Sequence, residues 1–227
     1  MTAQDDGRRG ETRTQRAATA IRELIFEGKL AAGSSHLESE LADQLGMSRT
    51  PVREAMLMLE LQGLIEVRPR KGARVLPVSP TDMADIYEVV IELESVAAGR
   101  AAAQQLDAKT LAPLAAAIDD MDAALRAQDR EAWAVADDRF HAALVALGGN
   151  SRIKGIVEMM ADQMRRARNV TLHLRPLPTD HGAACRELYR VIASGDAEGA
   201  RKLHREQRRR ASAELTGLLE RNRLETM

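Results

Sequence analysis

Three polar or cationic residues, Ser48, Arg49 and Thr50, stand at the start of an amphipathic run that ends at Gly63. A helix N-terminus carries free N–H groups and a partial positive charge, so it favours a phosphate. An arginine there can donate two parallel hydrogen bonds to guanine O6 and N7, and the hydroxyls can reach phosphates or bases. Arg53 follows one turn later and shares that face. Whether Ser48 or Thr50 is the N-cap stays open, but the pattern predicts a helix that reads the major groove of DNA.

Basic residues also gather at the tip of a predicted hairpin. Two short runs of strand-forming residues, 64–67 and 73–76, flank this tip, and its glycine supplies any positive φ that the turn needs. Cations at such a tip can reach phosphates, which position a protein on DNA without reading its sequence. Residues 46–76 contain six basic and three acidic groups, although the whole chain has a net charge of −1. The tip residues expected to contact DNA are Arg68, Arg70, Lys71 and Gly72.

A second pair of residues, Asp137 and His141, has the spacing of metal ligands. The two are four residues apart in a helical stretch, so both lie on one helix face. A carboxylate oxygen and an imidazole nitrogen are ligands that suit zinc. The same pair is also a common and weak ion pair along a helix.

These residues need a scaffold, and hydrophobic periodicity predicts three helices and a hairpin in residues 16–78. Helical spacing of apolar residues runs from about 17 to 28, then through a helix that Ser35 and Glu38 would cap, and then from 48 to 63. Two short helices, a tight turn, a third helix and a basic hairpin make a winged helix-turn-helix. Residues 1–15 are polar and are expected to be a disordered tail.

The rest of the chain, residues 79–222, is expected to be entirely helical. Ser79 followed by Pro80 is typical of an N-cap with proline at the first helical position, and it marks the domain boundary. The connections are short, which makes neighbouring helices antiparallel. The predicted fold class is therefore mainly α: a winged helix-turn-helix followed by a six- to seven-helix antiparallel bundle. The expected helices cover residues 81–105, 110–127, 130–147, 150–173, 179–194 and 196–222.

The composition narrows the classes of protein further. Hydrophobic residues make up 44% and aromatic residues only 2% of the 227 positions, which favours packed helices over a β-sandwich. Cys185 is the only cysteine, which excludes an intrachain disulfide and a cysteine-rich zinc cluster. The N-terminus lacks the apolar stretch of a signal peptide, and no long apolar run predicts a membrane span. We therefore expect a cytoplasmic protein with no membrane partner.

The N-terminal third resembles the GntR family of regulators. The resemblance implies a homodimer on a short palindromic operator in double-stranded DNA, usually a repressor that a metabolite releases. At Ser39 the family often has an arginine that contacts DNA, so the set of DNA contacts or the operator differs here. The residues that carry the resemblance are Gly33, Leu37, Glu38, Glu40-Leu41-Ala42, Leu45-Gly46, Ser48-Arg49-Thr50-Pro51-Val52-Arg53-Glu54-Ala55, Leu59, Gly63-Leu64-Ile65 and Lys71-Gly72.

The helical part is similar to the C-terminal domain of the FadR subfamily, the FCD type, which dimerises and binds a small-molecule effector. In many such domains an Asp and three His hold a divalent metal that helps to bind a small carboxylate. Asp137 and His141 match the first two ligands, whereas the third and fourth positions fall on Cys185 and Gln207. The family's ligand-contacting arginine falls on Val90. The landmarks are Tyr87-Glu88-Val89, Glu94, Asp137-x-x-Phe140-His141, Gly149-Asn150, Gly195-Asp196 and Ala200.

Three interpretations of this pocket follow. The first is a reduced or absent metal site in a pocket for a less acidic ligand. The second is a divalent metal, zinc by its ligand types, held by Asp137, His141 and Cys185. The third is a simple ion pair between Asp137 and His141. His181 and His204 lie about one turn before the expected positions, and their antiparallel helices argue against both serving as substitutes.

Two other functions are alternatives to a ligand-responsive regulator. A DNA-binding regulator without a ligand would have a pocket filled by side chains. A metal-dependent enzyme would use a metal at Asp137 and His141 to activate water. No P-loop, glycine-rich dinucleotide motif or nucleophile–histidine arrangement can be placed in context, so we expect no catalytic residues.

Overall fold

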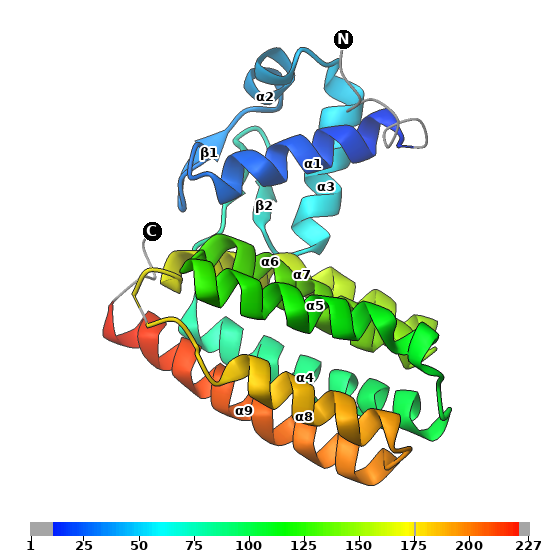
Figure 1. Ribbon diagram of the computed structural model, residues 1–227. Coiled ribbons are helices and arrows are strands. Elements are labelled where there is room, and N and C mark those ends of the chain that lie inside the picture. Colours follow the sequence, from blue (N-terminus) through cyan, green and yellow to red (C-terminus); the bar gives the residue numbers. More distant parts are fainter. Residues whose placement is uncertain (1–10, 175, 223–227) are drawn as a thin grey trace. The chain divides into compact units, whose positions relative to one another are not determined.

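A computed structural model describes residues 11–174 and 176–222. The chain divides between Val78 and Ser79 into two compact units, which Figure 1 colours along the sequence. The described part is mainly helical, as the sequence predicts, and none of its helices has the length and apolarity to cross a membrane. Residues 1–10 of the expected tail lie outside the described residues.

The N-terminal unit opens with α1 (Arg13–Phe26), α2 (Glu38–Leu45) and α3 (Arg49–Leu61). A capping box starts α1 three residues before the expected domain start at residue 16. The Thr12 N–H donates to the Gln15 side chain at 2.8 Å, and the Gln15 N–H donates to the Thr12 hydroxyl at 3.1 Å. The core of this unit draws on the three helices and the wing and comprises Ala17, Ala18, Ile21, Ile25, Leu30, Leu41, Ala42, Val52, Ala55, Met56, Leu59, Leu64, Ile65, Ala73 and Val75.

The expectation that Ser35 caps α2 is wrong, because Ser35–His36 form a short strand, β1. This strand pairs antiparallel with β3 (Gly72–Val75), which in turn pairs with β2 (Ile65–Arg68). Helix α2 begins after Leu37, whose N–H donates to the Glu40 side chain at 2.8 Å. The wing is thus a three-stranded sheet of order β1-β3-β2. A strand of two residues has no alternation from which the sequence could predict it.

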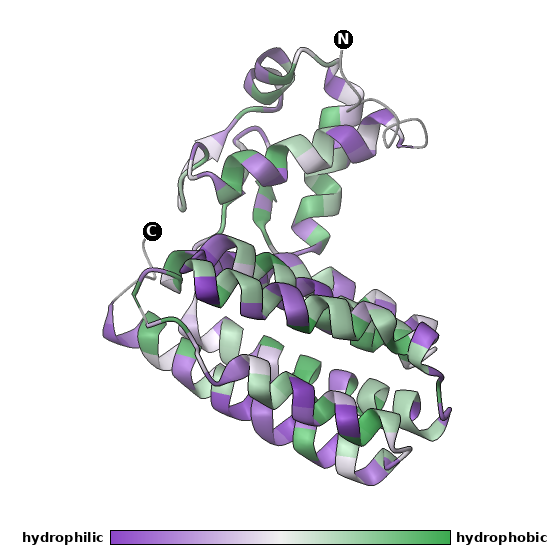
Figure 2. Ribbon diagram, in the orientation of Figure 1, coloured by the Kyte–Doolittle hydropathy of each residue, from purple (hydrophilic) through white to green (hydrophobic). Residues whose placement is uncertain are grey.

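The second unit is a bundle of helices, as predicted. A Ser79 cap and Pro80 begin its first helix, and a short linker separates each helix from the next. Hydrophilic and hydrophobic residues alternate around the helices (Figure 2), as amphipathic helices packed round a core require. The helices are α4 (Pro80–Ala103), α5 (Ala108–Ala127), α6 (Arg130–Leu147), α7 (Ser151–Thr171), α8 (His181–Ala193) and α9 (Ala197–Arg221).

Small residues bring the helices of the bundle close together. A Cβ at Gly148 would lie 2.8 Å from the Cα of Ala97, so the end of α6 reaches the backbone of α4. A Cβ at Gly99 would lie 2.9 Å from the backbone oxygen of Ala197, at the start of α9. These approaches bring polar side chains of α4, α6 and α9 within hydrogen-bonding range in the bundle centre.

Candidate nucleic-acid interface and bundle centre

The first turn of α3 is open to solvent. Ser48 is the N-cap, and within the described residues its hydroxyl makes no capping hydrogen bond. Ser48, Arg49 and Thr50 are all exposed, while Pro51 is buried beneath them. The free N–H groups of this turn and the Ser48 hydroxyl can therefore donate hydrogen bonds to a phosphate.

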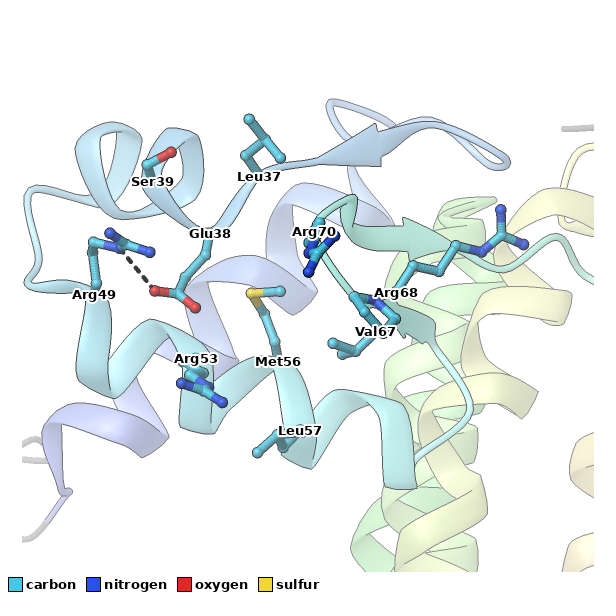
Figure 3. Close-up of a pocket in the computed structure, with 12 residues that line it drawn as sticks. Leu37, Glu38, Ser39, Arg49, Arg53, Met56, Leu57, Val67, Arg68 and Arg70 are labelled. Carbon is cyan, nitrogen blue, oxygen red and sulfur yellow. Dashed lines mark hydrogen bonds and ion pairs between the residues drawn. The ribbon is translucent and has the colours of Figure 1, made fainter.

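Arg49 is held by an acidic residue from the neighbouring helix. Its Nε donates to Oε1 of Glu38 at 2.9 Å, the contact drawn as a dashed line in Figure 3. The Arg49 side chain is 72% exposed and that of Glu38 only 22%. The contact occupies Nε and leaves the two terminal nitrogens of Arg49 as donors. The sequence analysis matched Glu38 to the family but did not predict this contact, because 11 residues separate the partners.

The wing presents its cations on two different faces. Arg68 donates from Nε and Nη2 to one carboxylate oxygen of Glu66, at 3.0 and 2.7 Å. This hydrogen bond is the main reason that the pKa of Glu66 is lowered. In Figure 3 the guanidinium of Arg68 extends away from α3, whereas that of Arg70 points toward it. Lys71 is exposed at the tip.

The wing is tied both to α3 and to β1. The Val67 N–H donates to the Glu60 carboxylate of α3 at 2.7 Å, which fixes β2 against the helix. Gly72 has a φ of +78°, and a Cβ there would lie 2.1 Å from the backbone oxygen of His36. Only glycine fits this position, because β1 passes directly over it.

Five of the predicted DNA contacts line one open groove of about 410 Å³, namely Arg49, Arg53, Arg68, Arg70 and Gly72. Ser48, Thr50 and Lys71 are exposed but are not among its lining residues. Arg49, Arg53 and Arg70 point their guanidinium groups toward the groove, Arg68 lines it with its guanidinium extending away from α3, and Ser39 lies at its edge (Figure 3). Its lining residues are Leu37, Glu38, Ser39, Arg49, Arg53, Met56, Leu57, Val67, Arg68, Pro69, Arg70 and Gly72.

In the bundle, Asp137 of α6 is buried and fully engaged. Its Oδ1 lies 2.8 Å from Nε2 of His181, and its Oδ2 accepts from Nη1 of Arg168 at 2.8 Å. Arg168 also pairs with Asp138 through its other terminal nitrogen. His181 is therefore beside Asp137, where the sequence analysis had placed Cys185.

A second buried carboxylate in the bundle is that of Glu94 on α4. Its Oε2 accepts from Nε of Arg208 at 2.9 Å and lies 3.5 Å from Nε2 of His204, both on α9. Nδ1 of His204 lies 3.1 Å from the Ser95 hydroxyl. Glu94, Ser95 and His204 are at most 1% exposed.

His141 stands between the two carboxylates. Its Nε2 is 3.5 Å from Asp137 Oδ1, and its Nδ1 is 3.7 Å from Glu94 Oε2. Neither nitrogen makes a hydrogen bond within the described residues. His141 can thus serve either carboxylate, one through each nitrogen.

The electrostatics of the two carboxylate environments differ. Burial alone would raise the pKa of Asp137, but the nearby His181 and His141 hold it well below its ordinary value. Burial by itself would lower the pKa of His181, but the neighbouring Asp137 has the larger effect and raises this pKa to about 10. The pKa of His204 is lowered well below its ordinary value, first by burial and then by His141 and Arg208. His204 is consequently a neutral imidazole.

A cavity of about 90 Å³ opens beside Asp137 and His141. Val90, the expected effector contact, is fully buried and does not line it. Gln207 donates to the backbone oxygen of Ala184, and Cys185 is buried in the core beside His181, so neither lines the cavity. The lining residues are Tyr87, Trp133, Asp137, Asp138, His141, Met164, Arg168, Pro178, His181, Arg208, Ala211, Glu214 and Leu215.

Arg208 and Arg168 are functional candidates that the sequence analysis missed. Arg208 lies in the basic run 204–210, yet it is 7% exposed and paired with Glu94. Arg168 is 8% exposed and lies in the cavity wall. Each of these arginines stands among other charged residues, so no contrast in the sequence marks it as buried. The signal that could have found them is the need of buried Asp137 and Glu94 for a cation.

Two sets of side chains in the described part of the chain can hold a metal ion. One is Asp137, His141 and His181, and the other is Glu94, His141 and His204. Within each set the ligand atoms lie within 4.8 Å of one another. Cys185 belongs to neither set. Each residue of the second set has a buried atom without a hydrogen bond within the described residues, namely Glu94 Oε1, His141 Nδ1 and His204 Nε2, so the set fits a metal. The carboxylate oxygen of Glu94 that lies closest to both imidazoles is Oε2.

Comparison with known proteins agrees with this architecture. Residues 13–75 match the family of bacterial regulatory proteins named gntR, and residues 85–209 match the FCD domain. An uncharacterized HTH-type transcriptional regulator of Agrobacterium vitis, from the TAR-I ttuE-ttuC' intergenic region, is 45% identical over 138 residues, which cover 59% of this chain and 80% of the relative. A probable D-xylose utilization operon transcriptional repressor of Paenarthrobacter nicotinovorans is 33% identical over 146 residues, 63% of each chain.

A solved structure is similar over most of the chain. The crystal structure of a putative transcriptional regulator GntR from Rhodococcus sp. RHA1 has a TM-score of 0.73 at 25% identity, and the alignment covers 91% of this chain and 99% of that one. The chain therefore belongs to the GntR family of bacterial transcriptional regulators, in the group that carries an FCD domain.

Proposed function

We propose that this regulator reads its operator with the first turn of α3 and contacts the adjacent sugar-phosphate backbone of the DNA with the tip of the wing. The observation that carries the proposal is the convergence of Arg49, Arg53 and Arg70 on one open groove beside a solvent-exposed helix N-terminus. Arg49 would read guanine, while the exposed Ser48, Thr50 and Lys71 would contact phosphates. Arg68 would add to this backbone contact only after release from Glu66.

The regulator acts as a homodimer in this proposal. A single α3 covers only a short half-site, and two-fold symmetry places two of them about 34–36 Å apart on one face of DNA. Members of the family bind palindromes in this way, and the Paenarthrobacter relative is named as a repressor. We infer repression as the mode of action, with release from the operator when an effector binds.

The effector would bind at the cavity beside Asp137 and His141. Arg168 Nε and Arg208 Nη2 are buried there and lack a hydrogen-bond acceptor within the described residues, so the walls can recognise an oxygen-bearing molecule. Both arginines are already neutralised by carboxylates, which favours a small ligand of low acidity over a multiply charged one. Such a ligand shifts DNA affinity only if it binds one dimer geometry better than the other.

The FCD unit would also hold a divalent metal, with zinc as the best candidate for nitrogen and carboxylate ligands. When bound, the metal would supply a Lewis-acid partner for the oxygen atoms of an effector. Family membership favours this sensory role over the metal-dependent hydrolysis weighed from the sequence. A regulator without an effector remains the alternative if the cavity admits no ligand.

Selection of genomic fragments by the purified dimer tests the function. The protein is mixed with sheared genomic DNA near physiological salt, and bound fragments are sequenced with and without pools of small metabolites. We expect enrichment of a few palindromes whose half-sites lie one helical turn apart, and loss of that enrichment with one metabolite pool. Equal recovery of all fragments in every condition would refute operator recognition.

A further inference from the structure

Three of the buried atoms in the bundle make no hydrogen bond within the described part of the chain and point to a ligand. They are Oε1 of Glu94, Nδ1 of His141 and Nε2 of His204. Glu94 and His204 are at most 1% exposed, and the His141 side chain is 12% exposed. Buried polar atoms are almost always hydrogen-bonded, because a buried atom without a partner loses its hydrogen bonds to water and gains none in the protein. The two imidazole nitrogens, on α6 and α9, both face the Glu94 carboxylate of α4, 3.7 and 3.5 Å from its Oε2, which indicates a missing partner common to the three residues.

We propose that Glu94, His141 and His204 bind a zinc-class divalent cation, in place of the Asp137-centred set that the resemblance to related domains implies. The three residues offer one carboxylate oxygen and two imidazole nitrogens within 4.8 Å of one another. Two imidazoles and one carboxylate are a ligand set that zinc uses, with a fourth position left for another molecule. The inference rests on the proposed metal in the FCD unit and names its ligands.

The surroundings of His204 and Glu94 support a built site. The Ser95 hydroxyl lies 3.1 Å from Nδ1 of His204 and can accept a hydrogen bond from Nδ1–H, which keeps the proton on Nδ1 and the lone pair on Nε2. Arg208 donates to Oε2 of Glu94 at 2.9 Å. The same oxygen lies 3.5 Å from Nε2 of His204 and 3.7 Å from Nδ1 of His141, so Arg208 orients the carboxylate that faces both imidazoles. Metal-binding residues typically have such outer partners, which fix the tautomer and the orientation of the ligand.

The alternative set around Asp137 is already satisfied by protein groups. Both oxygens of Asp137 are engaged, one by His181 and the other by Arg168. Nε2 of His181 is the atom that contacts Asp137, so a metal there would have to displace an existing pair. Of the two positions that the resemblance predicts as further ligands, Cys185 is in neither set and Gln207 is bonded to Ala184.

His141 is shared by the two sets and can serve only one metal at a time. A neutral imidazole has one lone pair and one N–H. If Nδ1 ligates the metal with Glu94, the proton sits on Nε2, which faces Asp137 Oδ1 at 3.5 Å. Asp137 would then accept a hydrogen bond from Nε2–H of His141 and orient its ring. Asp137 itself would ligate a metal only in the alternative set.

Cobalt titration of the metal-free full-length protein tests the proposal. The protein is prepared without a polyhistidine tag, stripped with a chelator and titrated with Co²⁺, whose visible absorption bands report bound ligands, and zinc is then added as competitor. We compare the wild type with His204→Gln, Ser95→Ala and, as the matched variant of the other set, His181→Gln. Helicity and melting temperature of each metal-free variant check that it folds.

We expect one Co²⁺ per chain, displaced by zinc, with no thiolate charge-transfer band in the near ultraviolet. His204→Gln should weaken binding at least 100-fold and Ser95→Ala about 10-fold, as for loss of a ligand and of its outer partner. His181→Gln should change affinity by no more than a few fold. The proposal is overturned if the wild type binds no Co²⁺, if a thiolate band appears, or if His181→Gln is the variant that abolishes binding. None of these outcomes depends on DNA, so operator recognition is tested separately.

Discussion

The contact between Glu38 and Arg49 leads to the most specific prediction about DNA recognition. Glu38 holds Nε of Arg49, so the arginine can approach guanine only with its two terminal nitrogens. Replacement of Glu38 by alanine frees a side chain that is 72% exposed and has no other fixed geometry. Ordering one such side chain on binding costs about 0.5–1.5 kcal/mol, so operator affinity should fall about 2- to 12-fold.

The same substitution should act in the opposite direction on random DNA. Removing a carboxylate from a groove that faces phosphates relieves a repulsion of up to about 1 kcal/mol in a solvent-exposed setting. The ratio of operator affinity to non-specific affinity should therefore fall by more than the operator affinity itself. Glu38→Gln removes the charge but keeps an oxygen that can accept from Nε, so it should raise non-specific binding while preserving most of the discrimination.

Fluorescence anisotropy with a selected operator and a scrambled duplex, each at two salt concentrations, measures both affinities. Arg49→Ala sets the scale, since loss of a bidentate guanine contact costs about 1–3 kcal/mol and relaxes specificity at one base pair. Glu23→Ala, on an exposed part of α1 away from the groove, controls for the change in net charge. An unchanged discrimination ratio in Glu38→Ala, with a reduced one in Arg49→Ala, would show that Glu38 does not position the arginine.

Three further predictions test the wing and the bundle. Lys71→Ala should weaken operator and scrambled DNA alike and lower the slope of log affinity against log salt by about one, because a tip lysine contacts phosphate; an effect confined to the operator would contradict this role. Gly72→Ala should abolish operator binding, since its Cβ would lie 2.1 Å from the His36 backbone oxygen. The control Gly155→Ala places its Cβ in open space on α7, so it should bind DNA normally, and its free energy of unfolding should rise by up to about 1 kcal/mol. In chelator-treated protein, the charged His181 stabilises the fold fully below its ordinary pKa of 6.5, and that stabilisation is lost as pH rises through its folded pKa of about 10. The melting temperature of the wild type should therefore fall more steeply from pH 7 to 10 than that of His181→Gln, and parallel curves would refute the ion pair with Asp137.

Much of this protein follows from its sequence, because the relevant signals are local. Periodicity and capping residues place the helices of the bundle within a few residues of where they lie. The run from Ser48 to Ala55 and the tip at Lys71-Gly72 identify the DNA-reading unit, since a helix start and a turn are both decided by neighbours in the chain. Composition alone, with 2% aromatic residues, favours packed helices over a β-sandwich.

Tertiary structure decides which charged residues are buried and which atoms meet. Arg208 pairs with Glu94 across 114 positions and Arg168 with Asp137 across 31, and no local pattern separates these arginines from their exposed neighbours. The strand β1 exists only because β3 lies beside it, and Arg49 is oriented by a residue on a different helix. His204, and not Gln207, faces Glu94 for the same reason. The rotation of α9 about its axis is set by its packing against α4 through small residues. Spacing along the chain does not reveal a shift of one helical turn.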